Sequence, residues 1–115
     1  MVKMAKRKIT PLKKFDTNQD LQEFIDQEKA WMYGRIVEAI ISAHNNLEDR
    51  AVILEAKIRE TMSVVTMNAD KSEWTNSLSL ALKWYESVEE FEKCSEVIKL
   101  LEHIKTDTPF PIKKK

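Results

Sequence analysis

The sequence predicts an all-α protein, a four-helix antiparallel bundle built from two helical hairpins, with flexible basic arms at both ends. Three observations predict it. Apolar residues recur at i, i+3 and i+4 along four segments, which is the helical period. The chain of 115 residues suits one domain. Residues 16–108 contain no Pro and only one Gly, Gly34, whereas a β-rich fold normally uses more turn glycines.

The first predicted helix covers residues 18–43. Thr17 is its expected N-cap, with Asp20 at the third helical position. Its apolar side chains form an arc that is too wide for one neighbour, so we expect it to pack against two or more helices. These side chains include Leu21, Phe24, Ile25, Trp31, Met32, Tyr33, Ile36, Val37, Ala39, Ile41 and Ala43.

The second predicted helix covers residues 46–65, after a polar break in the pattern. Asn46 is its expected N-cap, with Asp49 at the third position. A single stripe at helical spacing would face the core. It consists of Leu47, Ala51, Leu54, Ile58, Met62 and Val65.

Two more helices are predicted to form a hairpin. The third, over residues 74–85, can be capped by Asp70 with Glu73 or by Ser72 alone, and its core face carries Trp74, Leu78, Ala81, Leu82 and Tyr85. The fourth, up to residue 105, follows a capping box in which Ser87 is three residues before Glu90. Its expected core stripe is Phe91, Cys94, Val97, Ile98, Leu101 and Ile104. The turn between them is short, so the two helices should be antiparallel.

The charge distribution predicts three parts: a flexible basic arm over 1–16, a helical domain over 17–105 and a flexible basic tail over 106–115. Residues 16–104 carry 9 basic and 18 acidic side chains, so their net charge is −9. The basic arms could contact nucleic-acid phosphates, dock on another protein through Phe15 or Phe110, or fold back on the acidic domain. The residues predicted to bind nucleic acid are Lys6, Arg7, Lys8, Lys13, Lys14, Lys113, Lys114 and Lys115.

Signatures of an enzyme, a cofactor or a metal site are missing from the sequence. Neither His44 nor His103 has a Glu three residues before it, as a di-iron bundle would need. Cys94 lies on an apolar stripe, which favours a buried small hydrophobe over a reactive thiol. One cysteine allows no internal disulfide, and neither a signal peptide nor a membrane-length apolar run is present. We therefore expect a non-enzymatic, cytoplasmic protein without cofactor, metal or membrane contact.

Residues 78–101 resemble the UVR motif, a short helical hairpin found in bacterial excision-repair nuclease subunits and other proteins. The resemblance rests on Leu78, Leu82, Phe91, Glu92, Cys94, Ser95 and Leu101. Ile98 and Lys99 stand where the family has its Arg-Asp pair, and Tyr85 and Glu86 where it has two alanines. The resemblance implies a hairpin used for protein–protein contact. In general style, the short Lys- and Glu-rich chain is also similar to small accessory proteins of large bacteriophages.

The function that these patterns favour is protein–protein interaction, with a larger assembly or with a second copy of the chain. Leu80 and Trp84 lie about 100° or more from the core stripe of the third helix, so they are interface candidates unless the first helix covers them. Phe24, Trp31 and Phe110 are further candidates. The alternative is an accessory factor that holds nucleic acid through the arms. Glutamates around the start of the fourth helix indicate a solvated face or a docking surface for a basic partner.

Overall fold

The computed structural model describes residues 10–111 and shows an α+β fold, so the predicted all-α bundle is wrong. Its elements in chain order are β1 (Leu12–Phe15), α1 (Asn18–Gln27), α2 (Lys29–Asn45), β2 (Arg50–Ile58), β3 (Ser63–Asp70), the 3-10 turn η1 (Lys71–Glu73), α3 (Trp74–Ser87) and α4 (Phe91–Thr106). The strands form one three-stranded sheet in the order β1-β2-β3. Strand β1 lies inside the segment that we expected to be a flexible arm, and residues 1–9 of that arm lie outside the described residues.

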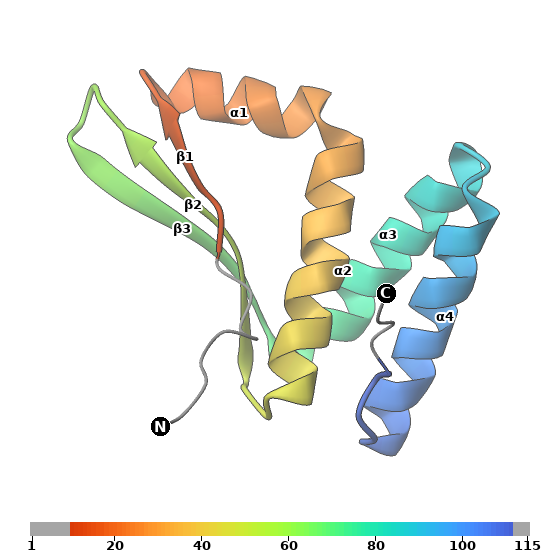
Figure 1. Cartoon of the computed structure of the whole chain (residues 1–115). Helices are drawn as coiled ribbons and strands as arrows, with labels where there is room; N and C mark the ends of the chain where they lie inside the picture. Colours follow the sequence, from red (N-terminus) through yellow and green to blue (C-terminus); the bar gives the residue numbers. More distant parts are fainter. Residues whose placement is uncertain (1–9, 112–115) are drawn as a thin grey trace.

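The sheet is mixed, because β1 runs parallel to β2 and β3 runs antiparallel to it. Parallel strands need a crossover connection, and helices α1 and α2 supply it. Both helices lie on one face of the sheet, and no described element covers the other face (Figure 1). Such a sheet exposes one face and buries the other.

The predicted second helix is wrong because its residues form β2, the hairpin turn and the first three residues of β3. A bulge at Ile53 explains the error. The register passes from Val52 opposite Asn68 to Leu54 opposite Met67, so one extra residue stands in β2. Ala51 and Leu54 therefore face the same side of the sheet although they are three residues apart. With Ile58, they reproduce the helical spacing of three and four.

Arg35 of α2 holds the bulge in place. Its Nε donates to the carbonyl oxygen of Ile53 at 3.0 Å, and its Nη2 donates to that of Val52 at 3.3 Å. A bulged residue leaves its ladder, and a buried carbonyl without a partner is costly. A guanidinium with several fixed donors meets both carbonyls and also pairs with Glu38 at 3.2 Å.

The small number of glycines led us to expect no strands, but the turns of this fold do not depend on glycine. The described residues include four non-glycine residues at positive φ: Leu47, Met62, Glu89 and Asp107. Each stands in a turn or at the end of a helix, where Gly or Asn is usual. Met62, at φ 55°, lies in the turn of the β2–β3 hairpin and is exposed. Three of these residues, Leu47, Met62 and Glu89, are not typical turn residues, so the sequence gives little sign of the turns that they form.

Helix α2 is the middle layer of the molecule. It packs on the sheet on one side and on the α3–α4 hairpin on the other (Figure 1). This explains the wide apolar arc of the first predicted helix, although one of its two neighbours is a sheet. That helix is also broken at Glu28, whose φ of −104° and ψ of 56° separate α1 from α2. The Thr17 cap is confirmed, because its Oγ1 accepts from the N–H of Asp20 at 3.1 Å.

The described part of the C-terminal tail is packed against the domain. The side chain of Asn45 donates to the carbonyl oxygen of Phe110 at 2.9 Å and accepts from its N–H at 2.8 Å. His44 is buried, and its Nε2 donates to the carbonyl oxygen of Thr108 at 2.7 Å. These hydrogen bonds join the described part of the tail, up to residue 111, to the end of α2.

Among residues 10–111, no helix is both long enough and apolar enough to cross a membrane.

Candidate protein-interaction surface

The α3–α4 hairpin is anchored at its root, where α3 leaves the sheet. Trp74 is fully buried, and its Nε1 donates to the carbonyl oxygen of Ala69 at 3.0 Å. Asp70 and Glu73 form a capping box around η1, which confirms one of the two caps considered for this helix. The indole and the cap fix the direction in which α3 leaves β3.

The tip of the hairpin is built differently from the prediction. Ser87 ends α3, and its Oγ donates to the carbonyl oxygen of Trp84 at 2.6 Å. Glu90 is the N-cap of α4 and makes no side-chain capping bond, so the predicted Ser87–Glu90 box is wrong. Glu89 stands between the helices at φ 61°, a left-handed conformation that costs a residue with a Cβ about 1–2 kcal/mol.

Large apolar side chains are exposed around this tip. Phe91 is 65% exposed and Ile98 is 45% exposed, although both were expected in the core stripe of the fourth helix. They are seven residues apart and therefore share one face of α4. Val88, which caps the end of α3, is also exposed. Figure 1 shows the turn between α3 and α4 projecting away from both the sheet and α2.

The sequence pattern assigned Phe91 to the core because the buried face of α4 is narrower than its apolar arc. The buried residues are Cys94, Val97 and Leu100, and Leu100 was absent from the predicted stripe. The real core face is thus rotated away from Phe91 and Ile98. The apolar pattern within α4 cannot locate this buried face by itself, because the packing of α3 and α2 determines which side of α4 is covered.

Exposed acidic side chains are frequent in the same segment as the exposed apolar residues. Residues 86–96 contain five glutamates and one lysine, a net charge of −4. Burial raises the pKa of the Tyr85 hydroxyl, and the charges of Glu96, Glu90 and Glu38 raise it further. Partial burial likewise raises the pKa of the Cys94 thiol, with a contribution from the charge of Glu86. In both groups burial is the larger cause, and the nearby acidic charges add to it.

Two predicted interface residues of α3 lie beside this surface. Leu80 is 50% exposed. Trp84 is only partly exposed, because its ring stacks on Tyr33 of α2 with centroids 5.4 Å apart and an interplanar angle of 25°. The first predicted helix, in its observed form α2, therefore covers much of Trp84 and leaves Leu80 open.

Phe24 and Trp31, also predicted to be interface residues, form an aromatic cluster at the break between α1 and α2. Their ring centroids are 5.4 Å apart, and Phe15 of β1 lies 5.5 Å from Phe24. Lys13 points into this cluster, with its Nζ 5.3 Å from the Phe24 ring centroid and 4.9 Å from that of Trp31. Through these cation–π contacts the charged group of Lys13 interacts with aromatic rings of its own chain.

Phe110, the third predicted anchor, is only 8% exposed and is part of the core. Its ring meets His103 edge-on at 5.4 Å. A residue that is buried in its own chain offers no surface to a partner, so the prediction that Phe110 anchors a partner is not supported by its place in the fold.

The predicted nucleic-acid residues divide between the faces of the sheet and the ends of the chain. Lys14 follows Lys13 in β1 and therefore points to the uncovered face, where it stands opposite Lys57 of β2 in the register. Both lysines are exposed. The remaining residues of this group lie outside the described residues: Lys6, Arg7, Lys8, Lys113, Lys114 and Lys115.

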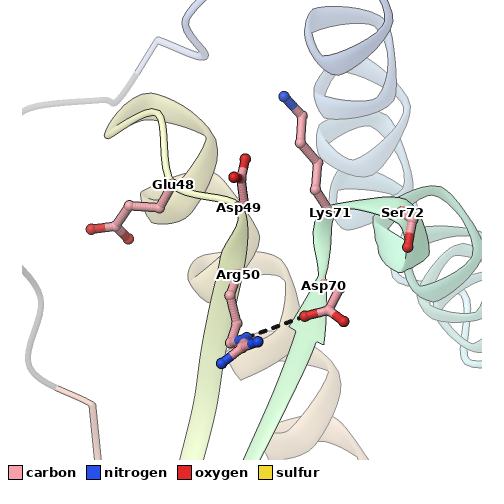
Figure 2. Close-up of a pocket in the computed structure, with 6 residues that line it drawn as sticks. All are labelled: Glu48, Asp49, Arg50, Asp70, Lys71 and Ser72. Atoms are coloured by element: carbon pink, nitrogen blue, oxygen red, sulfur yellow. Dashed lines mark hydrogen bonds and ion pairs between the residues drawn. The ribbon is translucent and has the colours of Figure 1, made fainter.

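A surface hollow lies between the start of β2 and the end of β3. Figure 2 shows the side chains that line it, Glu48, Asp49, Arg50, Asp70, Lys71 and Ser72. The drawn ion pair joins Arg50 Nε to Asp70 Oδ1 at 3.2 Å, and both side chains are more than half exposed. In Figure 2 the side chains of Asp49 and Lys71 extend to the same side, that of Glu48 points away from them, and the Arg50–Asp70 pair lies on the other side, so the charged groups do not meet at one centre. The hollow therefore lacks the convergent groups of a small-molecule site.

Within residues 10–111, no three His, Cys, Asp or Glu side chains gather closely enough to hold a metal ion. Comparisons with protein-family models, with curated proteins and with solved structures found no match.

Proposed function

We propose that the protein is a non-enzymatic interaction module that binds a protein partner through the tip of the α3–α4 hairpin. The observation that carries this proposal is the exposed Phe91, with Val88 and Ile98, in a segment in which residues 86–96 include five glutamates. An exposed aromatic residue with apolar neighbours and a polar rim is the usual composition of a binding hot spot.

The charge of the tip indicates the chemistry of the partner. A net charge of −4 over residues 86–96 would repel an acidic surface and attract a basic one. A complementary partner therefore presents an apolar pocket for Phe91 beside lysine or arginine side chains.

Affinity capture from a native lysate of the source cells tests this proposal. The tagged wild-type protein should retain a protein partner that survives nuclease treatment and is released by salt. Phe91→Ala should lose that partner, because truncation of a hot-spot aromatic costs about 2 kcal/mol or more of binding. The matched control is Leu12→Ala, since Leu12 is 53% exposed on β1, far along the chain from the hairpin. Equal capture by wild type, Phe91→Ala and Leu12→Ala would contradict the proposal.

A second candidate function is nucleic-acid association through the uncovered face of the sheet. It rests on Lys14 and Lys57, two like charges opposite each other in the register, which an anion would stabilise. Titration of labelled single- and double-stranded DNA at two salt concentrations tests it. Binding that fades steeply with salt and weakens in Lys57→Gln supports this candidate, and capture that disappears after nuclease treatment favours it over the first.

A further inference from the structure

The outer edge of β3 is open. Strand β3 pairs with β2 on one side, and no strand among the described residues pairs with its other side. In Figure 1 this edge lies on the side of the sheet away from β1, and no helix is drawn across it.

The hydrogen-bond pattern identifies the backbone groups that face this open edge. The N–H of Glu55 donates to the carbonyl oxygen of Pro11 at 3.1 Å, so the backbone groups of Glu55 point toward β1. Thr66 stands opposite Glu55 in β3, and antiparallel residues alternate between bonded and non-bonded pairs. The N–H and C=O groups of Thr66, Val64 and Asn68 therefore point outward, away from β2.

The two edges of the sheet differ in how they are protected. The β1 edge is four residues long, follows Pro11 and carries Lys13 and Lys14, which are usual devices against edge pairing. The β3 edge is eight residues long and has no Pro, and its first charged residue is the final one, Asp70. The bulge of the hairpin lies in β2 and leaves β3 regular. Strand β3 is thus an unprotected template for a further strand.

We propose that a second copy of this chain pairs with the open edge, β3 against β3, in an antiparallel six-stranded sheet. A two-fold axis perpendicular to the sheet keeps both helical layers on one side. This symmetry requires a register in which residues of the same face oppose each other. The register centred on Thr66 meets this condition. It places Thr66 opposite Thr66 of the second copy and Val64 opposite Asn68, so that all three outward-facing residues exchange backbone hydrogen bonds.

The distribution of charge along β3 is compatible with pairing to β3 of a second copy. In the register centred on Thr66, uncharged residues oppose each other from Ser63 to Ala69, and Asp70 opposes Met62. One position further out, Lys71 falls opposite Thr61 and next to Glu60 of the second copy, which has the opposite charge. The exposed Val64 also gains a cross-strand neighbour in the pair. This surface is separate from the hairpin tip, so the proposal is independent of the proposed function.

Sedimentation velocity on the purified full chain over a wide concentration range tests the proposal. The wild-type protein should sediment with twice the mass of one chain as its concentration rises. Thr66→Pro should weaken this association about tenfold or more, because it removes the outward N–H from both copies at the two-fold axis. The same change removes no hydrogen bond to β2, so the monomer should keep its far-UV circular dichroism. Thr66→Val, which keeps the N–H and the β-branched shape, should associate as the wild type does.

A charge exchange at the same position tests the register. Thr66→Lys and Thr66→Glu should each associate more weakly than the wild type, because like charges would face each other across the axis. An equimolar mixture of the two should associate more tightly than either alone, because Lys then faces Glu. A wild-type protein that stays monomeric would overturn the proposal, as would a Thr66→Pro protein that associates unchanged. A mixture no tighter than its components would overturn the register and, with it, the two-fold pairing proposed.

Discussion

The root and the tip of the α3–α4 hairpin differ in almost every property that stabilises a fold. At the root, Trp74 is fully buried, its indole N–H is bonded, and a capping box begins the first helix. At the tip, Phe91 is exposed, Glu89 is strained, and Glu90 caps its helix without a side-chain bond. Stability is therefore concentrated where the hairpin leaves the sheet. The tip is free to present a surface, and the following predictions test this division.

Trp74→Ala should have the largest effect. It removes the largest fully buried side chain and leaves the carbonyl of Ala69 without its donor, so we expect a loss of about 3–5 kcal/mol in the free energy of unfolding. Chemical denaturation followed by circular dichroism measures it. A loss below about 1 kcal/mol would mean that the root does not carry the stability of the hairpin.

Phe110→Ala should come second. The ring is nearly buried, and two hydrogen bonds to Asn45 hold its backbone, so we expect a loss of about 2–3 kcal/mol. We therefore also expect that removal of residues 107–115 lowers the free energy of unfolding. Thermal unfolding of Phe110→Ala and of a chain ending at Thr106 provides the test. An unchanged transition in both variants would show that the tail does not contribute to stability.

Trp84→Ala should cost about 1–2 kcal/mol, because the Trp84 ring stacks on Tyr33 but remains partly exposed. Denaturation under the same conditions as for Trp74→Ala allows a direct comparison between two tryptophans of one helix. If Trp84→Ala unfolds the protein as severely as Trp74→Ala, the division between root and tip fails along α3.

Glu89→Gly should have the smallest effect and the opposite sign. Glycine adopts the left-handed conformation of Glu89 without a Cβ clash, so we expect a gain of about 0.5–1 kcal/mol. Glu89→Ala removes the same charge but keeps the Cβ, and it should give no such gain. Equal stability of the two variants would show that charge, not backbone strain, determines the cost at this position.

The candidate site could be predicted only in part. The acidic residues at the start of α4 are visible in the sequence, and so is the exposed Leu80. Phe91 was predicted to be in the core but is exposed. The helical spacing of an apolar residue is the same whether or not another element packs over it. Phe110 was misplaced for the converse reason, since its partner Asn45 is distant in the chain.

The sequence by itself determined the elements whose causes are local. Helices α3 and α4, the Thr17 cap and the Asp70–Glu73 box follow from residues at most four positions apart, because helical hydrogen bonds and caps join near neighbours. Only the tertiary structure decided that residues 50–70 form strands. Their ladder depends on β1, on the bulge at Ile53 and on Arg35, and these contacts join distant residues. Apolar residues spaced by three and four positions fit either a helix or a bulged strand. The bulge places Ala51 and Leu54 on the same face of the sheet, so this spacing is also that of a strand.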